Sequence, residues 1–370
     1  MIARIAPFCL WLVGCLGSAF GGEWHVNAET GKDDQLGTMA APFATIQRAV
    51  DLSAEGDTIF LHPEGALYRQ SATISGKSGL MIEGNGVTLD GADPLPAEDW
   101  EKLEADLYRK RMPRTQWDRH LLIFNGRMER MGRTQSSNSP EFPPVGELKS
   151  GEFRFENIDD AEGWLYVRGT VNDLEWATRV NGIGTGGTLT GLRVKNLKAR
   201  HFLNDGFNIH GKARGLLFEN VEGYDCFDEG FSAHDTCEAE IVNGRFWGNE
   251  NGIADVNAAE TTYRQCEFRD NVNTDVLLIG LQHQLIDCRI VNTTTAAALV
   301  GGPRGEDQGF RLELSKVEII AEGKTGNARV RVNGGRLKIS DSTFTQVDFN
   351  VIGAEMEAVA LTVNGAAYQP

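Results

Sequence analysis

Residues 263–290 carry one short pattern twice: Tyr263-Arg264-Gln265-Cys266-Glu267-Phe268 is followed 22 residues later by Leu285-Ile286-Asp287-Cys288-Arg289-Ile290. Outward from this pair, the same apolar strand begins at Leu192, Leu216, Ile241, Leu312 and Leu337, so that the seven copies are spaced by 24, 25, 22, 22, 27 and 25 residues. A second apolar strand recurs at Phe207, Phe231, Ile253, Val276 and Ala298. Short strands at one period cannot bury an apolar face alone, and stacking them as rungs solves that problem.

The segments between these strands are rich in Asn, Asp and Gly, and the apolar runs have strand length, which excludes helical repeats. The sequence therefore predicts an all-β parallel β-helix. In this arrangement Cys266 and Cys288 occupy one column on adjacent rungs, about 4.8 Å apart along the axis. We expect a buried stack of thiols there rather than a disulfide.

The N-terminal part fits the same architecture. A strand at Trp24-His25-Val26-Asn27 leads to a run with helical spacing within residues 43–53, and strand patterns follow at Ile59-Phe60-Leu61 and Val87-Thr88-Leu89. Residues 24–92 resemble the capping segment of pectin-lyase-like right-handed β-helix proteins, in which a short helix plugs the open end of the apolar core. The resemblance implies an N-terminal helical cap followed by the first rungs, and we expect the main β-helix over residues 181–370.

Between these parts, residues 93–180 lose the period. Their order of Trp100, a Phe124-Asn125-Gly126-Arg127 hairpin, Gly151-Glu152-Phe153 and Leu165-Tyr166-Val167-Arg168 resembles the β-domain inserted into some β-helix glycoside hydrolases. We therefore predict an inserted β-rich segment. The alternative is a long excursion from one edge that covers the side of the helix.

Residues 1–19 have the pattern of an export signal: a charged Arg4, an apolar run from Ile5 to Leu16, and small residues before a cut after Ala19. A competing interpretation is a lipoprotein box at Leu12-Val13-Gly14-Cys15, which would leave Cys15 lipidated. We expect an exported protein, whether periplasmic, extracellular or on the cell surface. No other stretch is long and apolar enough to predict a transmembrane segment.

The charge composition of the chain restricts the classes of molecule that it is expected to bind. The formal net charge of −16 argues against nucleic acid, whose phosphates need a basic face. An anionic polysaccharide would need a local basic cluster or a bridging cation. We expect a monomer that takes a polysaccharide or oligosaccharide substrate and requires no cofactor, with Ca²⁺ as an option if the reaction is an elimination.

Two consecutive rungs carry matching polar turns. They read Asn204-Asp205-Gly206-Phe207-Asn208-Ile209-His210 and Asp228-Glu229-Gly230-Phe231-Ser232-Ala233-His234-Asp235. Asp205 and Glu229 share one predicted column, Asn204 and Asp228 another, and His210 and His234 a third. Because Asn and Asp before Gly also suit tight turns, each acid alone has a purely structural explanation. The acids together with two histidines in register indicate a functional site.

Short motifs in these rungs resemble three enzyme families. The Asn204-Asp205-Gly206-Phe207 and Asp228-Glu229-Gly230-Phe231 turns resemble the paired acidic elements of polygalacturonase-type glycoside hydrolases, whose downstream Gly-His-Gly and Arg-x-Lys elements are absent here. Gly230-Phe231-Ser232-Ala233-His234-Asp235 resembles the Gly-Phe-Asp-Pro-His-Asp element of mannuronan C5-epimerases, with Ser232 and Ala233 in place of Asp-Pro. The inserted segment resembles that of β-helix exo-glycosidases.

Chemistry leaves three hypotheses. Stacked rungs bring carboxyl groups near the ~5–5.5 Å that retaining glycosidases use, which favours hydrolysis with Asp205, Asp228 and Glu229 as catalytic candidates and Asp205 with Asp228 as the first pair. The other candidate sugar ligands are Asn204, Asn208, His210 and Asp235. Alternatively His234, oriented by Asp235, acts as the base of a lyase or epimerase, with the uronate neutralised by Arg245, Arg264, Lys212 or Ca²⁺. The third hypothesis is a β-helix that binds glycans without catalysis.

Overall fold

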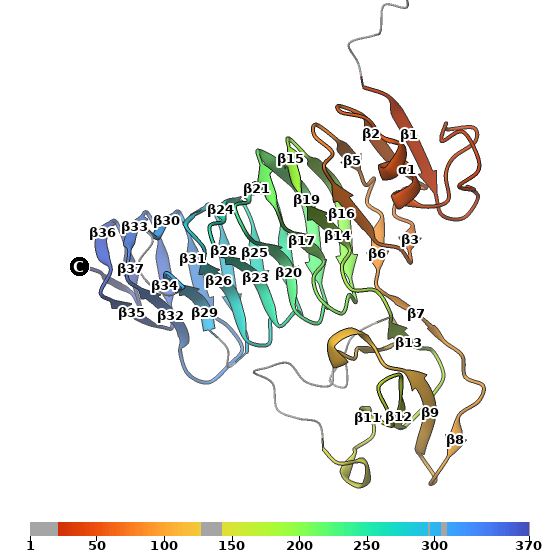
Figure 1. The fold of residues 1–370 in the computed structure, drawn as a ribbon. Helices are drawn as coiled ribbons and strands as arrows, with labels where there is room; N and C mark the ends of the chain where they lie inside the picture. Colours follow the sequence, from red (N-terminus) through yellow and green to blue (C-terminus); the bar gives the residue numbers. More distant parts are fainter. Residues whose placement is uncertain (1–20, 127–142, 295–296, 305–308, 370) are drawn as a thin grey trace, which may run out of the picture.

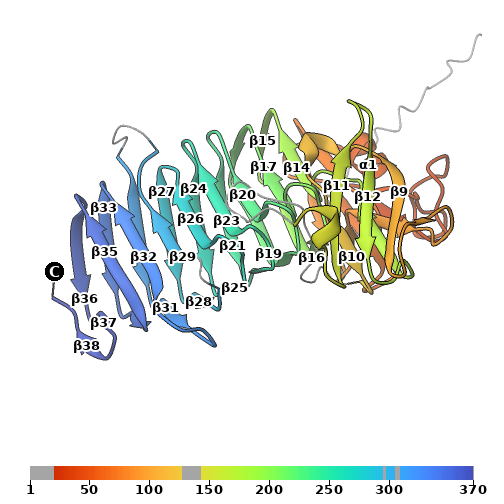
Figure 2. The ribbon, with the colours of Figure 1, turned by 90° about the horizontal axis from the view of Figure 1, so that it is seen from below.

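The computed structural model describes residues 21–126, 143–294, 297–304 and 309–369. Parallel strands stack in sequence order from the N-terminal end to the C-terminal end and form a β-helix, with a separate group of strands beside its N-terminal part (Figures 1 and 2). The all-β prediction is therefore confirmed. The predicted export signal at residues 1–19, with Cys15, lies outside the described residues, and so does Arg127 of the predicted hairpin.

Each turn of the β-helix contributes strands to three columns. The first contains β1 (Glu23–Asn27), β2 (Thr58–His62), β5 (Met81–Glu83), β16 (Arg193–Arg200), β19 (Leu216–Tyr224), β21 (Glu238–Val242), β24 (Glu260–Arg264), β27 (Gln282–Ile286), β30 (Arg311–Ser315), β33 (Arg336–Ser340) and β36 (Glu355–Val359). The second contains β3 (Leu67–Tyr68), β6 (Thr88–Asp90), the later halves of β16 and β19, β22 (Arg245–Trp247), β25 (Glu267–Arg269), β28 (Arg289–Asn292), β31 (Glu318–Ala321), β34 (Thr343–Thr345) and β37 (Thr362–Val363), which β38 (Ala366–Ala367) joins in antiparallel fashion.

The third column is a sheet of nine strands that carries the polar turns predicted above. It contains β4 (Ala72–Ser75), β14 (Ile183–Gly186), β17 (Phe207–Ile209), β20 (Glu229–Ala233), β23 (Asn251–Val256), β26 (Thr274–Ile279), β29 (Ala297–Gly301), β32 (Ala328–Asn333) and β35 (Val347–Ile352). A short pair, β15 (Thr188–Thr190) and β18 (Lys212–Arg214), lies beside this column. Phe207, Phe231, Ile253 and Val276 follow one another in register inside the core, as predicted.

Three details of the predicted register are wrong. Ile241 pairs with Phe218 rather than with Leu216, and Leu285 pairs with Leu314 rather than with Leu312, so the repeat was placed two residues out of phase at both steps. Val276 pairs with Leu299 rather than with Ala298. In all three cases the neighbouring apolar residue is also buried, so hydrophobicity alone did not distinguish the two registers.

The corner between the first and second columns repeats one backbone conformation. Asn196, Asn220, Asn243, Gln265 and Asp287 all have φ between 53° and 56°, the left-handed region that Asn and Asp tolerate best among non-glycine residues. The amide of Asn220 donates to Asn196 at 2.9 Å, and the amide of Asn243 donates to Asn220 at 2.7 Å. These side chains therefore form a hydrogen-bonded ladder that holds successive rungs in register.

The thiol stack is confirmed. Cys266 and Cys288 are both 2% exposed, free of disulfides and hydrogen-bonded to each other. Cys226 and Cys237 are also buried free thiols.

A single short α-helix, α1 (Ile46–Leu52), is present in the described residues, and it lies within the range that the sequence indicated. Thr45 caps its N-terminus, and Ile46, Ala49 and Val50 pack into the main core. That this helix closes the end of the core stays a prediction. No helix in the described residues is both long and apolar enough to cross a membrane.

The segment between β6 and β14 forms two antiparallel sheets. One contains β7 (Ala92–Leu95), β13 (Leu174–Ala177) and β10 (Leu122–Phe124); the other contains β8 (Glu101–Lys102), β9 (Leu107–Pro113), β12 (Glu162–Arg168) and β11 (Glu152–Asn157). Two short 3-10 helices, η1 (Gln116–Asp118) and η2 (Val145–Glu147), connect them. A hydrophobic cluster built around Phe153, Leu165 and Trp176 packs these sheets. The predicted domain boundaries at 93 and 180 stay an interpretation.

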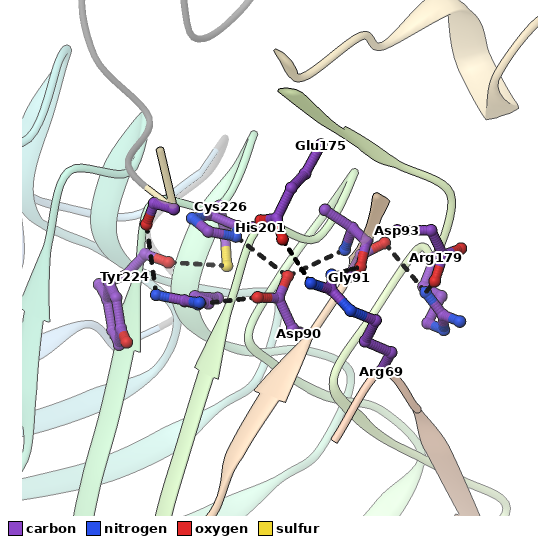
Figure 3. Close-up of polar contacts among 12 residues, drawn as sticks. Arg69, Asp90, Gly91, Asp93, Glu175, Arg179, His201, Tyr224 and Cys226 are labelled. Carbon is purple, nitrogen blue, oxygen red and sulfur yellow. Dashed lines mark hydrogen bonds and ion pairs between the residues drawn. The ribbon is translucent and has the colours of Figure 1, made fainter. Parts of the chain in front are cut away.

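Ion pairs join this segment to the β-helix where the chain leaves and re-enters it (Figure 3). Asp90, at the end of β6, accepts hydrogen bonds from Arg200 at 2.9 Å and from His201 Nδ1 at 3.0 Å. Arg69 pairs with Glu175 of β13. Burial raises the pKa of Asp90, but His201 and Arg200 together lower it further than burial raises it, so this buried carboxyl is held as an anion.

Candidate active site

The two polar turns lie on adjacent rungs in the predicted register. The backbone N–H of Asp228 donates to Asn204 at 3.1 Å, and that of Gly206 donates to Glu229 at 3.0 Å. Glycine is required at position 206 because a Cβ there would lie 2.8 Å from the carbonyl oxygen of Gly230. The close approach of the backbones brings the three carboxyl groups of Asp205, Asp228 and Glu229 together, with ligand oxygens within 4.8 Å of one another.

Asp205 and Glu229 form a buried carboxyl pair. Asp205 is 1% exposed and accepts hydrogen bonds from Ser232 Oγ at 2.6 Å, from the Glu229 backbone at 3.0 Å and from Asn208. Asn251 donates to Glu229 at 2.7 Å. Burial, and after it the charge of neighbouring carboxylates, raises the pKa of both acids, that of Glu229 well above its usual range. Glu229 therefore holds a proton and donates it in a hydrogen bond to Asp205.

Asp228 is paired differently. Arg119 places one amino group 2.8 Å from its carboxylate and donates through the other to Asn204 at 2.5 Å. Arg119 follows η1 in the inserted segment, so the segment contributes directly to the site. Sequence reasoning missed this residue because nothing in Trp117-Asp118-Arg119 distinguishes it from any other exposed arginine, and its partner lies more than 100 residues away.

The histidines lie together at the other end of the same strands. The rings of His210 and His234 stack with centroids 4.1 Å apart and planes 6° apart, and His210 Nδ1 lies 3.2 Å from Asp235. Burial, followed by the charge of His210, lowers the pKa of His234 to about 4, so this imidazole is neutral near pH 7. His234 lies two positions after Ser232, a distance of roughly 7 Å along the strand direction. The structure thus brings the predicted residues to one face as an acidic cluster and a separate histidine pair.

A hollow of about 470 Å³ lies beyond the histidines and is lined by Asp235, Asn257, Gly280, Arg304 and neighbouring residues. Arg304 forms no ion pair within the described part of the chain. A larger hollow of about 850 Å³ covers the outer face of β21, β24, β27 and β30, away from the acids. Several of its charged residues pair with one another, as Arg264 does with Glu240 at 2.6 Å, so we take the acidic cluster rather than the larger hollow as the candidate site. Arg264, proposed from sequence as a uronate ligand, is therefore already paired.

Two groups of side chains in the described residues have the spacing of metal ligands. One is Asp205, Asp228 and Glu229, and the other is Asp90, Glu175 and His201 (Figure 3). The first group offers only carboxylate oxygens, which suit Ca²⁺, although the guanidinium of Arg119 already offsets part of its charge. In the second group the carboxylates of Glu175 and Asp90 already form ion pairs with Arg69 and Arg200, respectively. A Ca²⁺ requirement stays a proposal tied to the elimination hypothesis.

Neither a protein-family model nor a curated protein sequence matches this chain. Solved structures share its fold at low sequence identity. XylC in complex with xylose is 13% identical, with a TM-score of 0.62 over 92% of this chain and 68% of that one. The pectate lyase Pel9A is 10% identical, with a TM-score of 0.52 over 95% and 82%, and a protein named glycoside hydrolase is 9% identical, with a TM-score of 0.50 over 93% and 96%. These similarities show the fold, which is the right-handed parallel β-helix predicted from the repeats.

Proposed function

We propose that this chain is a carbohydrate-active enzyme that hydrolyses a glycosidic bond at Asp228 and Glu229. The observation that carries the proposal is that the carboxyl groups of Glu229 and Asp228 lie within 4.8 Å of each other, with Arg119 paired to Asp228 and with the pKa of Glu229 raised by burial and by neighbouring carboxylates. Hydrolysis of a glycoside needs one protonated and one ionised carboxyl group at short range. The names of the structural neighbours, a glycoside hydrolase and a pectate lyase among them, support the carbohydrate theme.

The solvent exposure of Asp228 and Asp205 indicates which of the two acts as the nucleophile. Asp228 retains 22% of its side-chain exposure and is available to attack a sugar carbon, whereas Asp205 is buried behind Ser232 and Asn208. We therefore replace the first pair suggested by sequence: Glu229 donates the proton, Asp228 is the nucleophile, and Asp205 positions Glu229. Oxygens within 4.8 Å favour the retaining geometry, in which the carboxyl groups lie ~5–5.5 Å apart.

A second candidate function rests on the histidines. Neutral His234 can accept a proton near pH 7, and Arg304 beside it can neutralise a uronate carboxylate. These features support a lyase or C5-epimerase acting on a uronate polymer.

One screen separates hydrolysis from elimination, and C5-epimerisation, which gives neither product, is measured by NMR of the treated alginate. Xylan, pectate, alginate and neutral oligosaccharides are incubated with the protein, and both new reducing ends and absorbance near 235 nm are measured. Hydrolysis gives reducing ends without absorbance, and Asp228→Asn or Glu229→Gln abolishes them while His234→Ala leaves most of the rate. Elimination gives absorbance that is lost in His234→Ala. If all three variants keep full activity, the site assignment is wrong; binding without turnover supports the non-catalytic hypothesis.

We also propose that the protein is exported after cleavage following Ala19. N-terminal peptide mapping of the native protein tests this proposal. An intact Met1 would contradict it, and a lipid-modified peptide beginning at Cys15 would support the lipoprotein alternative.

A further inference from the structure

Trp117 is an exposed aromatic residue held in an unfavourable backbone conformation. Its side chain is 60% exposed, and both Trp117 and Asp118 have positive φ values, 59° and 55°. Two successive non-glycine residues in the left-handed region persist only where surrounding contacts fix them. Here Arg114 pairs with Asp118 through Nε at 2.9 Å, and Asn157 donates to the same carboxylate at 3.4 Å. These contacts thus stabilise a strained backbone conformation that keeps the apolar ring of Trp117 exposed to solvent.

The ring lies beside the acidic cluster. The guanidinium carbon of Arg119 lies 5.2 Å from the centre of the Trp117 ring and 5.2 Å from that of the Phe227 ring, while its amino group contacts Asp228 at 2.8 Å. With a C–N bond of about 1.3 Å, the Trp117 ring centre is at most about 9 Å from the Asp228 carboxylate. That separation places the ring next to a sugar whose anomeric carbon lies at Asp228.

We propose that Trp117 is a sugar-binding platform, on which a pyranose ring stacks beside the one being cleaved. An aromatic ring with one exposed face matches the apolar C–H face of a pyranose, and binding sites commonly combine such rings with a few polar groups. The role of the sugar next to Asp228 rests on the proposed function. The substrate of the protein is accordingly an oligosaccharide or polymer of at least two sugars, because a monosaccharide bound at Asp228 would leave the Trp117 ring without a stacked sugar.

A purely structural role makes a different prediction. If Trp117 only shields the ion pair of Arg119 with Asp228, its removal lowers kcat and shifts the pH profile for every substrate. A platform instead sets affinity: Trp117→Ala raises KM for a hexasaccharide roughly 5- to 10-fold, leaves kcat nearly unchanged, and has little effect on a short aryl glycoside. Trp117→Phe retains a ring and recovers most of the affinity.

Binding without turnover gives an independent test. In the Glu229→Gln background, titration calorimetry with xylohexaose and with hexagalacturonate measures Kd for the variant alone and combined with Trp117→Ala. Trp164→Ala is the matched control, because Trp164 also contacts an arginine, Arg109 at 4.2 Å, but lies in β12. We expect Trp117→Ala to weaken binding of whichever hexasaccharide binds by roughly 5- to 10-fold, with Trp164→Ala unchanged.

The outcomes separate this inference from the proposed function. Equal Kd values with and without Trp117, or no binding of either hexasaccharide, overturn the platform. If the unsubstituted protein turns over a substrate and Trp117→Ala has an unchanged KM, the proposed hydrolase function holds and the platform is wrong. Binding that depends on Trp117 in a protein that cleaves nothing retains the platform and removes the hydrolase.

Discussion

Asp255 is a carboxyl group inside the β-helix, on β23, where it pairs in register with Ala233 of β20. It is 0% exposed and accepts hydrogen bonds from Ala233 N at 3.1 Å, Thr261 Oγ1 at 2.6 Å and Tyr263 OH at 2.9 Å. Burial raises its pKa from 3.8 to about 7. When it is protonated, it can donate to Thr261, whose hydroxyl then donates to neutral His283 at 2.8 Å, and burial lowers the pKa of that histidine to about 3.

The sign of the pH effect follows from proton binding. Between pH 4 and 7 the folded state binds a proton at Asp255 that the unfolded state does not, so stability decreases as pH rises. With a folded pKa of about 7 against an unfolded value of 3.8, this one group removes about 3 kcal/mol of unfolding free energy between pH 5 and pH 8. Asp255→Asn cannot titrate and should lose that part of the decline.

Urea unfolding followed by circular dichroism at pH 5 and pH 8 measures this effect. The decline for Asp255→Asn should be about 3 kcal/mol smaller than for the unsubstituted chain; comparing the two pH values cancels any constant cost of the amide. Asp57→Asn is the control. Burial raises the pKa of Asp57, but hydrogen bonds from Ala54, Trp24 and Gly22 lower it further, so the contribution of Asp57 is lost only as pH falls below its unfolded pKa of 3.8. The change in stability between pH 5 and pH 8 should therefore be the same in Asp57→Asn as in the unsubstituted chain. An equal decline in Asp255→Asn and the unsubstituted chain would refute the reasoning.

Four further outcomes are expected. Arg119→Ala should reduce kcat/KM about 10²-fold on the substrate found by the screen, with only partial recovery in Arg119→Lys, because the two-armed contact to Asp228 and Asn204 is lost; full activity would contradict it. Glu229→Gln should lose about 10²–10⁴-fold on natural glycosides but far less on an aryl glycoside whose leaving group needs no proton, and equal losses on both would argue against an acid role. The unsubstituted enzyme should lose activity on the alkaline side, as Glu229 with its raised pKa deprotonates; a flat alkaline limb would oppose this. EDTA should leave the Tm unchanged, since Arg200 already pairs with Asp90; a drop in Tm restored by Zn²⁺ would indicate a metal there instead.

Sequence alone predicted the fold because the rung period is visible wherever the chain turns at the same kind of corner. It also placed Asp205 with Glu229 and His210 with His234, since residues at equal positions in successive rungs must stack. The two-residue phase error at Ile241 arose because Ala239 and Ile241 both face the core.

Arg119 and the burial of Asp205 were beyond reach for another reason. Both depend on how the inserted segment and the facing side chains pack against the rungs, and that packing has no period.

The ladder at Asn196, Asn220 and Asn243 makes each turn of the helix an interchangeable unit. A duplicated or deleted unit of 22 to 25 residues would present the same corner to its new neighbours, so a rung could be added or removed with the corner hydrogen bonds retained. The two rungs that Arg119 reaches are the exception. These two rungs are fixed by the inserted sheets, which leave the β-helix next to them. A rung could therefore be added on the C-terminal side without moving the acidic cluster.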